Sequence, residues 1–277
     1  MVGSSKASRS LTDQSRWNDE QGAKRLVELE MSRKFDVWFD SLPLRKRLFV
    51  DAIGDVAGKR VLEFGSGRGE ISVVLAQRGA TCVGVDVGPD LVQLGQSVAN
   101  VNDVGDKCSF VCASIDDLSA LESNEFDLVV GFAILHHVSE DGVKRALAEA
   151  HRVLRAPGRA MFLEPVEDSK TFELLQDVVP AGKRGTSTYR PSRLNRKAWA
   201  DFMERSDDRA MTTAEFKSAQ GSFRAVSFDY DGMLARITRI IPSKSLGRIL
   251  DRVDTVLTHP KSPLKRFSRS VIVTFSK

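Results

Sequence analysis

The sequence predicts a doubly wound α/β fold, in which a parallel sheet is flanked by helices. The chain has 277 residues, of which 42% are hydrophobic and 28% charged, so it can bury the core of a large globular domain. Short apolar runs alternate with helix-like segments from residue 59 to residue 164. These runs are uniformly apolar and rich in β-branched residues, which is typical of buried parallel strands.

Five runs are expected to be strands, and three segments between them repeat apolar residues at helical spacing. The expected strands are 60–64, 81–85, 109–112, 126–132 and 159–163. The expected crossover helices are 70–77, 90–99 and 143–154.

The rest of the chain divides around this core, which spans residues 54–165. Residues 1–16 are polar and expected to be disordered, and residues 17–53 predict a helical, aromatic cover broken at Pro43. Residues 166–211 are irregular and predict a lid over a substrate. Residues 212–277 are expected to complete the sheet, with a short helix around Glu215, strands at 223–230 and 270–275, and a basic helical insertion at 232–267.

Cysteine usage and the absence of long apolar stretches bear on the compartment. The three cysteines, Cys82, Cys108 and Cys112, lie within or beside apolar runs, which suits a reducing environment. The polar start lacks the apolar core of a secretion signal, and no stretch reaches the ~18 uninterrupted apolar residues of a membrane span. We therefore expect a soluble cytoplasmic protein.

The net charge of +4 is unevenly distributed. Residues 231–277 carry ten Lys or Arg against three Asp, which gives +7 there and −3 elsewhere. This basic segment either forms a solvated helical face or attracts an anionic substrate or membrane surface. Phe267 is the only aromatic residue interleaved among its cations, so nucleic acid is disfavoured as a partner.

A glycine-rich turn, in the stretch VLEFGSGRGE, joins the first expected strand to the helix after it. Gly65, Gly67 and Gly69 let the backbone turn and approach a ligand closely, with Ser66 between the first two. Their even spacing departs from the G-x-G-x-x-G of pyrophosphate binders, and Glu63 brings a carboxylate toward the place of a diphosphate. The turn is either a mere tight connection or a site for a ligand with a cationic amino acid end, which we favour.

Asp86 ends the second expected strand, the position from which a carboxylate in this fold reaches ribose hydroxyls. Val87 would then lie beside an adenine face. Ser114 and Ile115, after the third strand, are placed to meet the same ring by a hydrogen bond and by apolar contact. The alternative role for Asp86 is a cap on the helix that begins near residue 90.

Together these stretches resemble the class I S-adenosylmethionine-dependent methyltransferases, over about residues 59–165. VLEFGSGRGE is similar to the family's first motif, CVGVDVG to its acidic second motif, and FDLVVGFAILHHVSEDGVKRALAEAHRVLRAPGR to its fourth strand, the following helix and the approach to the fifth strand. The run AILHHV is most similar to the small-molecule branch, which includes ubiquinone, menaquinone and natural-product methyltransferases. Ser114 departs from that branch, which usually has Asp there.

The resemblance implies a Rossmann-like, seven-stranded mixed sheet in the order 3-2-1-4-5-7-6 with an antiparallel seventh strand. It also implies S-adenosyl-L-methionine as the cofactor and a small molecule as the methyl acceptor, with no metal. The residues expected to bind the cofactor are Glu63, Gly65, Ser66, Gly67, Asp86, Val87, Ser114, Ile115 and Phe132.

The candidate catalytic residues are His136, His137 and Glu164, at the ends of the fourth and fifth strands. The cofactor's methyl group is already activated, so the protein mainly aligns it with the acceptor. If the acceptor is a hydroxyl, a histidine can remove its proton, and analogy with related enzymes favours His136 as the one that faces the acceptor. Glu164 could orient a histidine or contact the acceptor. The alternative is that it caps the turn at Pro165 or pairs with an arginine. With a more acidic or more nucleophilic acceptor, the histidines would only shape the site.

The same stretches of sequence disfavour two other classes of enzyme. A DNA methyltransferase would have prolines after the fourth strand, and residues 131–136 contain none. A nicotinamide dehydrogenase disagrees with the glycine spacing and with Glu63. Two alternatives stay open: a cofactor-binding regulator without catalysis, and an enzyme for a membrane-associated lipid or quinone that residues 232–277 would approach. Oxygen is favoured as the acceptor atom over nitrogen and carbon.

Overall fold

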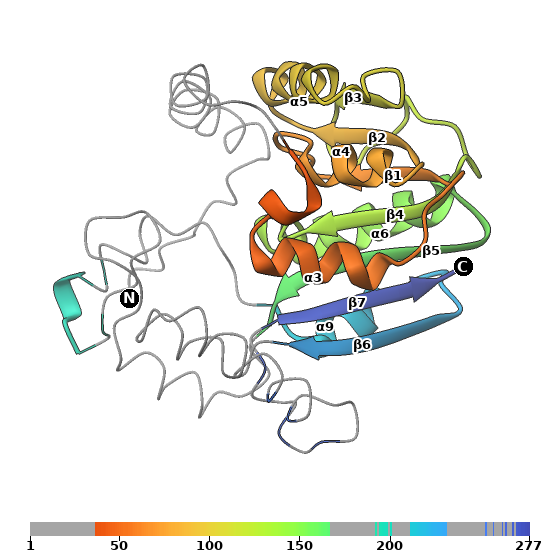
Figure 1. The fold of residues 1–277 in the computed structure, drawn as a ribbon. Helices are drawn as coiled ribbons and strands as arrows, with labels where there is room; N and C mark the ends of the chain where they lie inside the picture. Colours follow the sequence, from red (N-terminus) through yellow and green to blue (C-terminus); the bar gives the residue numbers. More distant parts are fainter. Residues whose placement is uncertain are drawn as a thin grey trace. The chain divides into compact units, whose positions relative to one another are not determined.

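A seven-stranded sheet forms the centre of the fold in a computed structural model of the chain, with strand order β3-β2-β1-β4-β5-β7-β6 (Figure 1). The predicted order is thereby confirmed. The strands are β1 (Arg60–Phe64), β2 (Thr81–Asp86), β3 (Cys108–Cys112), β4 (Phe126–Phe132), β5 (Leu154–Pro165), β6 (Ala225–Asp231) and β7 (Ser270–Ser276). The arrows of β6 and β7 point in opposite directions in Figure 1, so the sheet is mixed.

The structure describes residues 37–166, 211–231 and 270–277, with isolated residues at 192, 194–198, 200, 253, 257, 262, 264 and 268. The expected disordered start, most of the N-terminal cover, the lid and the basic insertion therefore lie almost wholly outside the described residues. The chain divides into two compact units. The first comprises Met1–Phe162, Ala219–Val226 and Thr274–Lys277, and the second Leu163–Ser218 and Ser227–Val273.

Parallel pairing in the first unit places the ends of β1, β2 and β3 at one edge of the sheet. Residue Glu63 of β1 lies opposite Gly84 of β2, and Gly84 lies opposite Phe110 of β3. On the other side of β1, Phe64 lies opposite Gly131 of β4. Because parallel strands end at the same edge, the turns that follow them are neighbours, as a ligand site in this fold requires.

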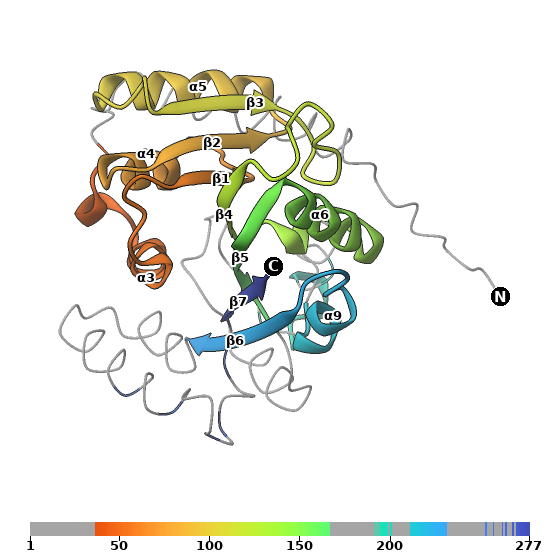
Figure 2. The same ribbon diagram turned by 90° about the vertical axis from the view of Figure 1, so that its right-hand side faces the viewer.

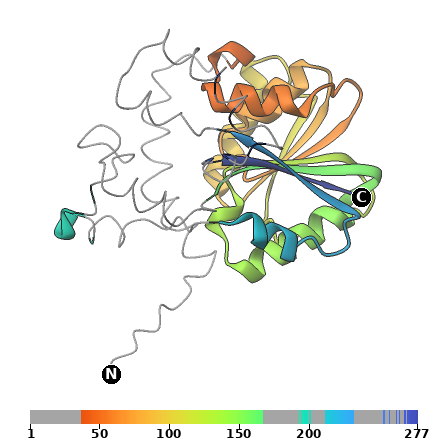
Figure 3. The ribbon, with the colours of Figure 1, turned by 90° about the horizontal axis from the view of Figure 1, so that it is seen from below.

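Helices cover both faces of the sheet in the first unit. The helices α3 (Leu44–Ile53), α4 (Glu70–Gln77) and α5 (Pro89–Val101) lie on one face, and α6 (Glu140–Val153) lies on the other (Figures 2 and 3). Helix α3 begins directly after Pro43, where the sequence predicted a break. Ser139 caps α6, since its hydroxyl accepts a hydrogen bond from the backbone N–H of Gly142 at 3.1 Å.

Aromatic rings fill the core beside the central strands. The rings of Phe64 and Phe162 have centroids 5.8 Å apart, and Phe162 and Phe275 follow at 6.4 Å. All three are fully buried, as their apolar runs predicted. This packing makes β1 a rigid base for the turn that follows it.

The predicted boundary between the helix and the strand near residue 154 was wrong. The sequence indicated a helix to Leu154 and a strand from Arg159, whereas β5 begins at Leu154 directly after α6 ends at Val153. Pro157 and Gly158 suggest a turn in the sequence. In the folded chain this stretch is extended instead, and the Arg155 guanidinium pairs with the carboxylate of Asp127 at 2.5 Å.

The described part of the second unit includes the short helix α9 (Thr213–Ser218). Thr212 caps it, because its hydroxyl accepts a hydrogen bond from the N–H of Glu215 at 3.2 Å. The ring of Phe216 packs against that of Phe228 in β6, with centroids 6.5 Å apart. These contacts anchor α9 on one face of β6.

Candidate cofactor-binding and active site

The glycine turn after β1 adopts a conformation that L side chains rarely take. Gly65, Gly67 and Gly69 have φ of +63°, +52° and +72°. A Cβ on Gly65 would lie 2.4 Å from the side chain of Ile134, whereas one on Gly67 would meet nothing within 4 Å. The turn is therefore packed from behind at Gly65 and open at Gly67.

Ser66 lies within this turn, and its backbone N–H donates to the carbonyl of Val85 in β2 at 3.0 Å. Its side chain is only 6% exposed. Among the described residues, its hydroxyl has no hydrogen-bond partner. A buried hydroxyl without a partner costs free energy, so a polar ligand at this turn could supply what the fold leaves open.

Asp86 lies at the end of β2, and its carboxylate bridges two turns. One oxygen accepts a hydrogen bond from the backbone N–H of Gly67 and the other from that of Gly88, each at 2.9 Å. Helix α5 begins at Pro89 and has no side-chain cap, which disfavours the alternative that Asp86 caps it. The ribose contact predicted for Asp86 stays a prediction.

Glu63 is directed toward helix α4. Its carboxylate accepts hydrogen bonds from the backbone N–H and the hydroxyl of Ser72, at 3.0 and 2.6 Å. The side chain is 3% exposed, and burial raises its pKa to about 7 against the pull of Ser72 and Lys46. Direct contact of Glu63 with a cofactor stays a prediction; the structure shows that it fastens α4 behind the turn.

Ser114 and Ile115 follow β3, on the same sheet edge as Asp86, which lies opposite Cys112. Ile115 is buried. The Ser114 hydroxyl donates to the carboxylate of Asp116, and Arg145 of α6 pairs with that carboxylate. Sequence reasoning missed Asp116 and Arg145, although Arg145 belongs to a helical series that the sequence displays.

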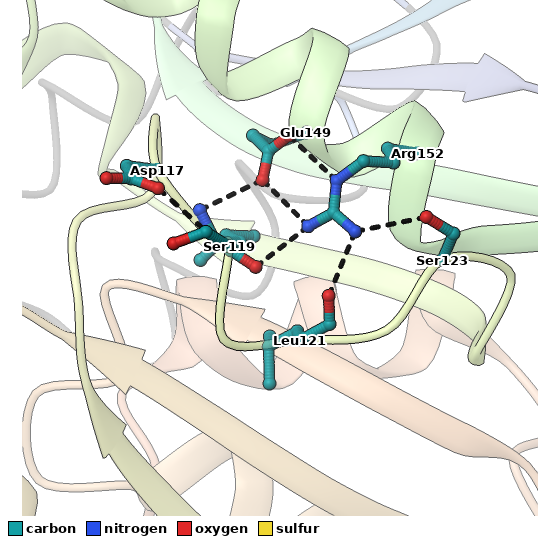
Figure 4. A network of polar contacts seen from close by, with 7 residues as sticks. Asp117, Ser119, Leu121, Ser123, Glu149 and Arg152 are labelled. Atoms are coloured by element: carbon teal, nitrogen blue, oxygen red, sulfur yellow. Dashed lines mark hydrogen bonds and ion pairs between the residues drawn. The ribbon is translucent and has the colours of Figure 1, made fainter.

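That series is a polar stripe on α6 formed by Arg145, Glu149 and Arg152, at i, i+4 and i+7. The Glu149 carboxylate accepts a hydrogen bond from the N–H of Leu118 at 2.9 Å. The Arg152 guanidinium donates to the carbonyls of Leu118 and Leu121 at 2.8 and 2.9 Å (Figure 4). The stripe thus holds the loop between β3 and β4 at its polar backbone groups.

Phe132 ends β4 and contacts helix α3. Its ring centroid is 5.9 Å from that of Phe49, and the ammonium of Lys46 lies 5.6 Å above the ring. Lys46 also pairs at 2.5 Å with Glu70, the last residue of the glycine stretch. Helix α3 is therefore tied to the glycine turn and to β4, a connection that no spacing in the sequence indicated.

His136 and His137 lie in a short 3-10 helix, η3 (Leu135–His137), which follows β4. Their rings have centroids 4.0 Å apart and are inclined by 38°. His136 is buried, with 6% exposed, and His137 is exposed. The two side chains thus differ in burial, while the assignment of His136 to the acceptor stays a prediction.

Glu164 lies in β5 and is fully buried. It belongs to the second compact unit and the histidines to the first, so its predicted partnership with a histidine stays a prediction. Val87 is half-buried, and its carbonyl accepts a weak hydrogen bond from the thiol of Cys112 at 3.6 Å. Within the described part of the chain, no cluster of His, Cys, Asp and Glu could hold a metal ion.

Comparison with known proteins decides the family. A family model described as a methyltransferase domain matches residues 62–162, which span β1 to β5 and include the glycine turn, Asp86 and both histidines. These residues form a class I S-adenosylmethionine-dependent methyltransferase domain. S-adenosyl-L-methionine is the methyl donor of this class, and the turn fits it through the open Gly67, the unpartnered Ser66 hydroxyl and the Asp86 carboxylate.

Relatives of this methyltransferase act on small molecules according to their names. It is 28% identical over 193 residues to the ubiquinone biosynthesis O-methyltransferase of Neisseria meningitidis, which covers 66% of this chain and 79% of that protein. The protein of the same name from Pseudomonas syringae is 27% identical over 175 residues, or 60% of this chain and 72% of that one.

Solved structures share the fold of this methyltransferase. Geranyl diphosphate C-methyltransferase from Streptomyces coelicolor matches with a TM-score of 0.57 over 98% of each chain, at 13% identity. An S-adenosylmethionine-dependent methyltransferase from Mesorhizobium loti matches with a TM-score of 0.55 over 86% of this chain and 100% of that one, at 18% identity. None of the described helices is long and apolar enough to cross a membrane.

Proposed function

We propose that this methyltransferase methylates a hydroxyl group of a small organic acceptor, with His136 as the base. The observation that carries the proposal is the packing of the histidine segment against the glycine turn. The side chain of Ile134 fills the space that a Cβ on Gly65 would need, and η3 begins at the next residue. The two histidines therefore follow directly on a residue that touches the cofactor turn.

In the proposed reaction, the cofactor supplies the methyl group and the residues of the chain hold the cofactor and accept a proton. When bound, S-adenosyl-L-methionine supplies an electrophilic methyl group on a sulfonium sulfur. The glycine turn and Asp86 hold and orient its amino acid and nucleoside parts. An imidazole nitrogen of His136 accepts the proton that the acceptor hydroxyl loses, and His136 later returns that proton to solvent.

A histidine base is needed for some acceptor atoms and not for others, so a base role for His136 favours a hydroxyl as the acceptor. An amine or an activated carbon can attack as it stands, whereas a neutral hydroxyl becomes an effective nucleophile as its proton leaves. Histidine titrates near neutral pH and suits that exchange. The O-methyltransferase names of the two curated relatives described above support the same acceptor atom.

A membrane-associated quinol or lipid is the second candidate acceptor. The observation that favours it is the charge of +7 over residues 231–277, which would attract an anionic lipid surface. The acceptor panel in the test therefore includes both forms of substrate.

The test compares His136→Ala with His137→Ala, its exposed neighbour, in methyl transfer from labelled S-adenosylmethionine. The panel holds soluble phenols and catechols, an isoprenoid quinol in anionic vesicles, and an amine. We expect His136→Ala to lower kcat by about 100-fold or more, and His137→Ala by less than about threefold. Cofactor affinity, measured by calorimetry with S-adenosylhomocysteine, should be unchanged in both. Equal loss of affinity and turnover in His136→Ala, or transfer to the amine alone, would overturn the proposal.

A further inference from the structure

Lys46 of helix α3 contacts two parts of the proposed active site. Its ammonium lies 2.5 Å from Oε2 of Glu70, which ends the glycine stretch, and 5.6 Å from the ring centroid of Phe132, which ends β4. In the segment after Phe132, Ile134 packs beside Gly65, and η3 with the two histidines begins at the next residue. Lys46 therefore lies where the glycine turn and the histidine segment come together.

At this place one carboxylate pairs with two cations. Oε1 of Glu70 lies 3.5 Å from Nη1 of Arg68, while Oε2 accepts a hydrogen bond from Lys46. The carboxyl of Glu63 also interacts with the charge of Lys46, but burial raises its pKa to about 7, so it is mostly uncharged below that pH. The group formed by Lys46, Arg68 and Glu70 therefore carries a net positive charge beside the glycine turn.

The three side chains of this group are partly buried. Lys46 is 26% exposed, Glu70 19% and Arg68 30%, so water and salt screen their charges less than those of fully exposed pairs, and a ligand can still reach them. The ammonium of Lys46 has three N–H donors, and its contact with Oε2 of Glu70 uses one of them. The group thus has both charge and donors for a second anion.

We propose that Lys46, together with Arg68, binds an anionic oxygen group, a carboxylate or a phosphate, on the methyl acceptor. The inference rests on the proposed function and names the charge class of its acceptor: a hydroxylated compound that also carries an anionic group. The anion accepts an N–H of Lys46 and is attracted by the net charge of the group. Glu70 holds the ammonium in place and offsets part of that charge. A neutral acceptor of the same shape gains neither contribution.

The test uses the full chain saturated with S-adenosyl-L-homocysteine and three phenols that differ in one substituent. Calorimetry measures the Kd of para-hydroxybenzoate, para-hydroxyphenyl phosphate and the neutral para-hydroxybenzamide. We expect the wild type to bind at least one anionic phenol about tenfold or more tightly than the amide, as one charge-assisted hydrogen bond would allow. The tighter of the two anions tells a carboxylate site from a phosphate site.

Two variants should change this preference in opposite directions. Lys46→Met removes the charge, keeps an unbranched stem and leaves Glu70 paired with Arg68, so the anionic and neutral phenols should bind within about twofold of each other. Glu70→Gln keeps an acceptor for Lys46 but removes the opposing charge, so the preference for the anion should rise by about threefold or more. If Lys46 and Glu70 only fastened α3, both variants would act in the same direction.

Arg47→Met is the matched control. It removes the neighbouring cation of α3 and changes the net charge as Lys46→Met does, but the guanidinium of Arg47 pairs with the highly exposed Asp40 at 3.7 Å. This variant should keep the wild-type ratio of Kd values.

Separate outcomes bear on the anion site and on the proposed function. The inference alone is overturned if the wild type binds the three phenols equally or not at all. It is also overturned if the preference survives Lys46→Met, falls in Glu70→Gln or is lost in Arg47→Met. The proposed base is tested by turnover: His136→Ala should lose methyl transfer yet keep the preference for the anion in binding. Wild-type turnover in His136→Ala would overturn the base role and leave the anion site standing.

Discussion

The carboxylate of Asp86 lies 2.9 Å from the backbone nitrogen of Gly67 and accepts its hydrogen bond. Because Gly67 has φ of +52° and no atom within 4 Å of where its Cβ would be, the turn is open where it meets Asp86. The carboxylate at the end of β2 therefore fixes the open part of the turn after β1. The two motifs of the sequence form one site through this contact.

Asp86→Asn should weaken the binding of S-adenosylhomocysteine by about 10- to 100-fold in calorimetry. The amide keeps one acceptor, so it can serve Gly67 or Gly88 but not both, and it loses the charge that ribose hydroxyls would favour. Asp90→Asn, an exposed carboxylate at the start of α5, is the control and should bind as the wild type does. Undiminished binding by Asp86→Asn would refute its role.

The sequence predicted the central elements well because their signals are local. The strands at 60–64 and 126–132 lie where their apolar runs indicated, since a buried parallel strand must be apolar along its length. Helix α3 begins after Pro43 for an equally local reason, because proline suits the start of a helix and not its interior. These features need no knowledge of what packs against them.

Features that depend on distant partners could not be predicted in the same way. Glu63 looks like a ligand group in the sequence, yet its carboxylate is directed to Ser72, which only the crossover geometry brings near. Asp116 and Arg145 are 29 residues apart, and their ion pair requires α6 to lie against the loop after β3. The sequence left residues 155–158 as a connection between the expected helix and the expected strand, whereas pairing within the sheet makes that stretch part of β5.

Glu63 should make stability depend on pH. Its pKa is raised by burial from 4.5 to about 7, so the folded state binds its proton more tightly than the unfolded state does. The stabilisation this gives is fully present below about pH 4.5 and is lost as the pH rises through about 7. The loss amounts to about 3 kcal/mol at most, from 1.36 kcal/mol per pKa unit.

Glu63→Gln tests this dependence by denaturant unfolding at about pH 5 and about pH 8. The amide keeps an acceptor for Ser72 and has no charge to bury, so the variant should be more stable than the wild type at the higher pH. Its free energy of unfolding should change less between the two pH values than that of the wild type. Glu122→Gln, at an exposed site, should follow the wild type. If the free energy of unfolding of Glu63→Gln changes with pH as much as that of the wild type, another group causes the pH dependence.

The ring of Phe110 occupies a slot made by three glycines from three elements. A Cβ on Gly69, Gly84 or Gly95 would lie 2.5, 2.5 or 2.8 Å from this ring. Gly69 ends the glycine turn and precedes α4, Gly84 is in β2, and Gly95 is in the middle of α5. The absence of a Cβ at these three positions therefore makes room for the ring. Because the ring packs against Gly69, it also supports the glycine turn.

Gly95→Ala should destabilise the protein when the Phe110 ring is present and stabilise it when the ring is removed. In a free helix the substitution would stabilise by about 1 kcal/mol, but collision with the ring should cost about 1–3 kcal/mol, so the net effect is destabilising. In a Phe110→Val background the ring is absent, and Gly95→Ala should then stabilise, as measured by denaturant midpoints. Ser97→Ala, on the exposed side of α5, should have the same small effect in both backgrounds. If Gly95→Ala changes the stability in the same direction with and without the ring, the close approach of Phe110 is not the reason why position 95 needs a glycine.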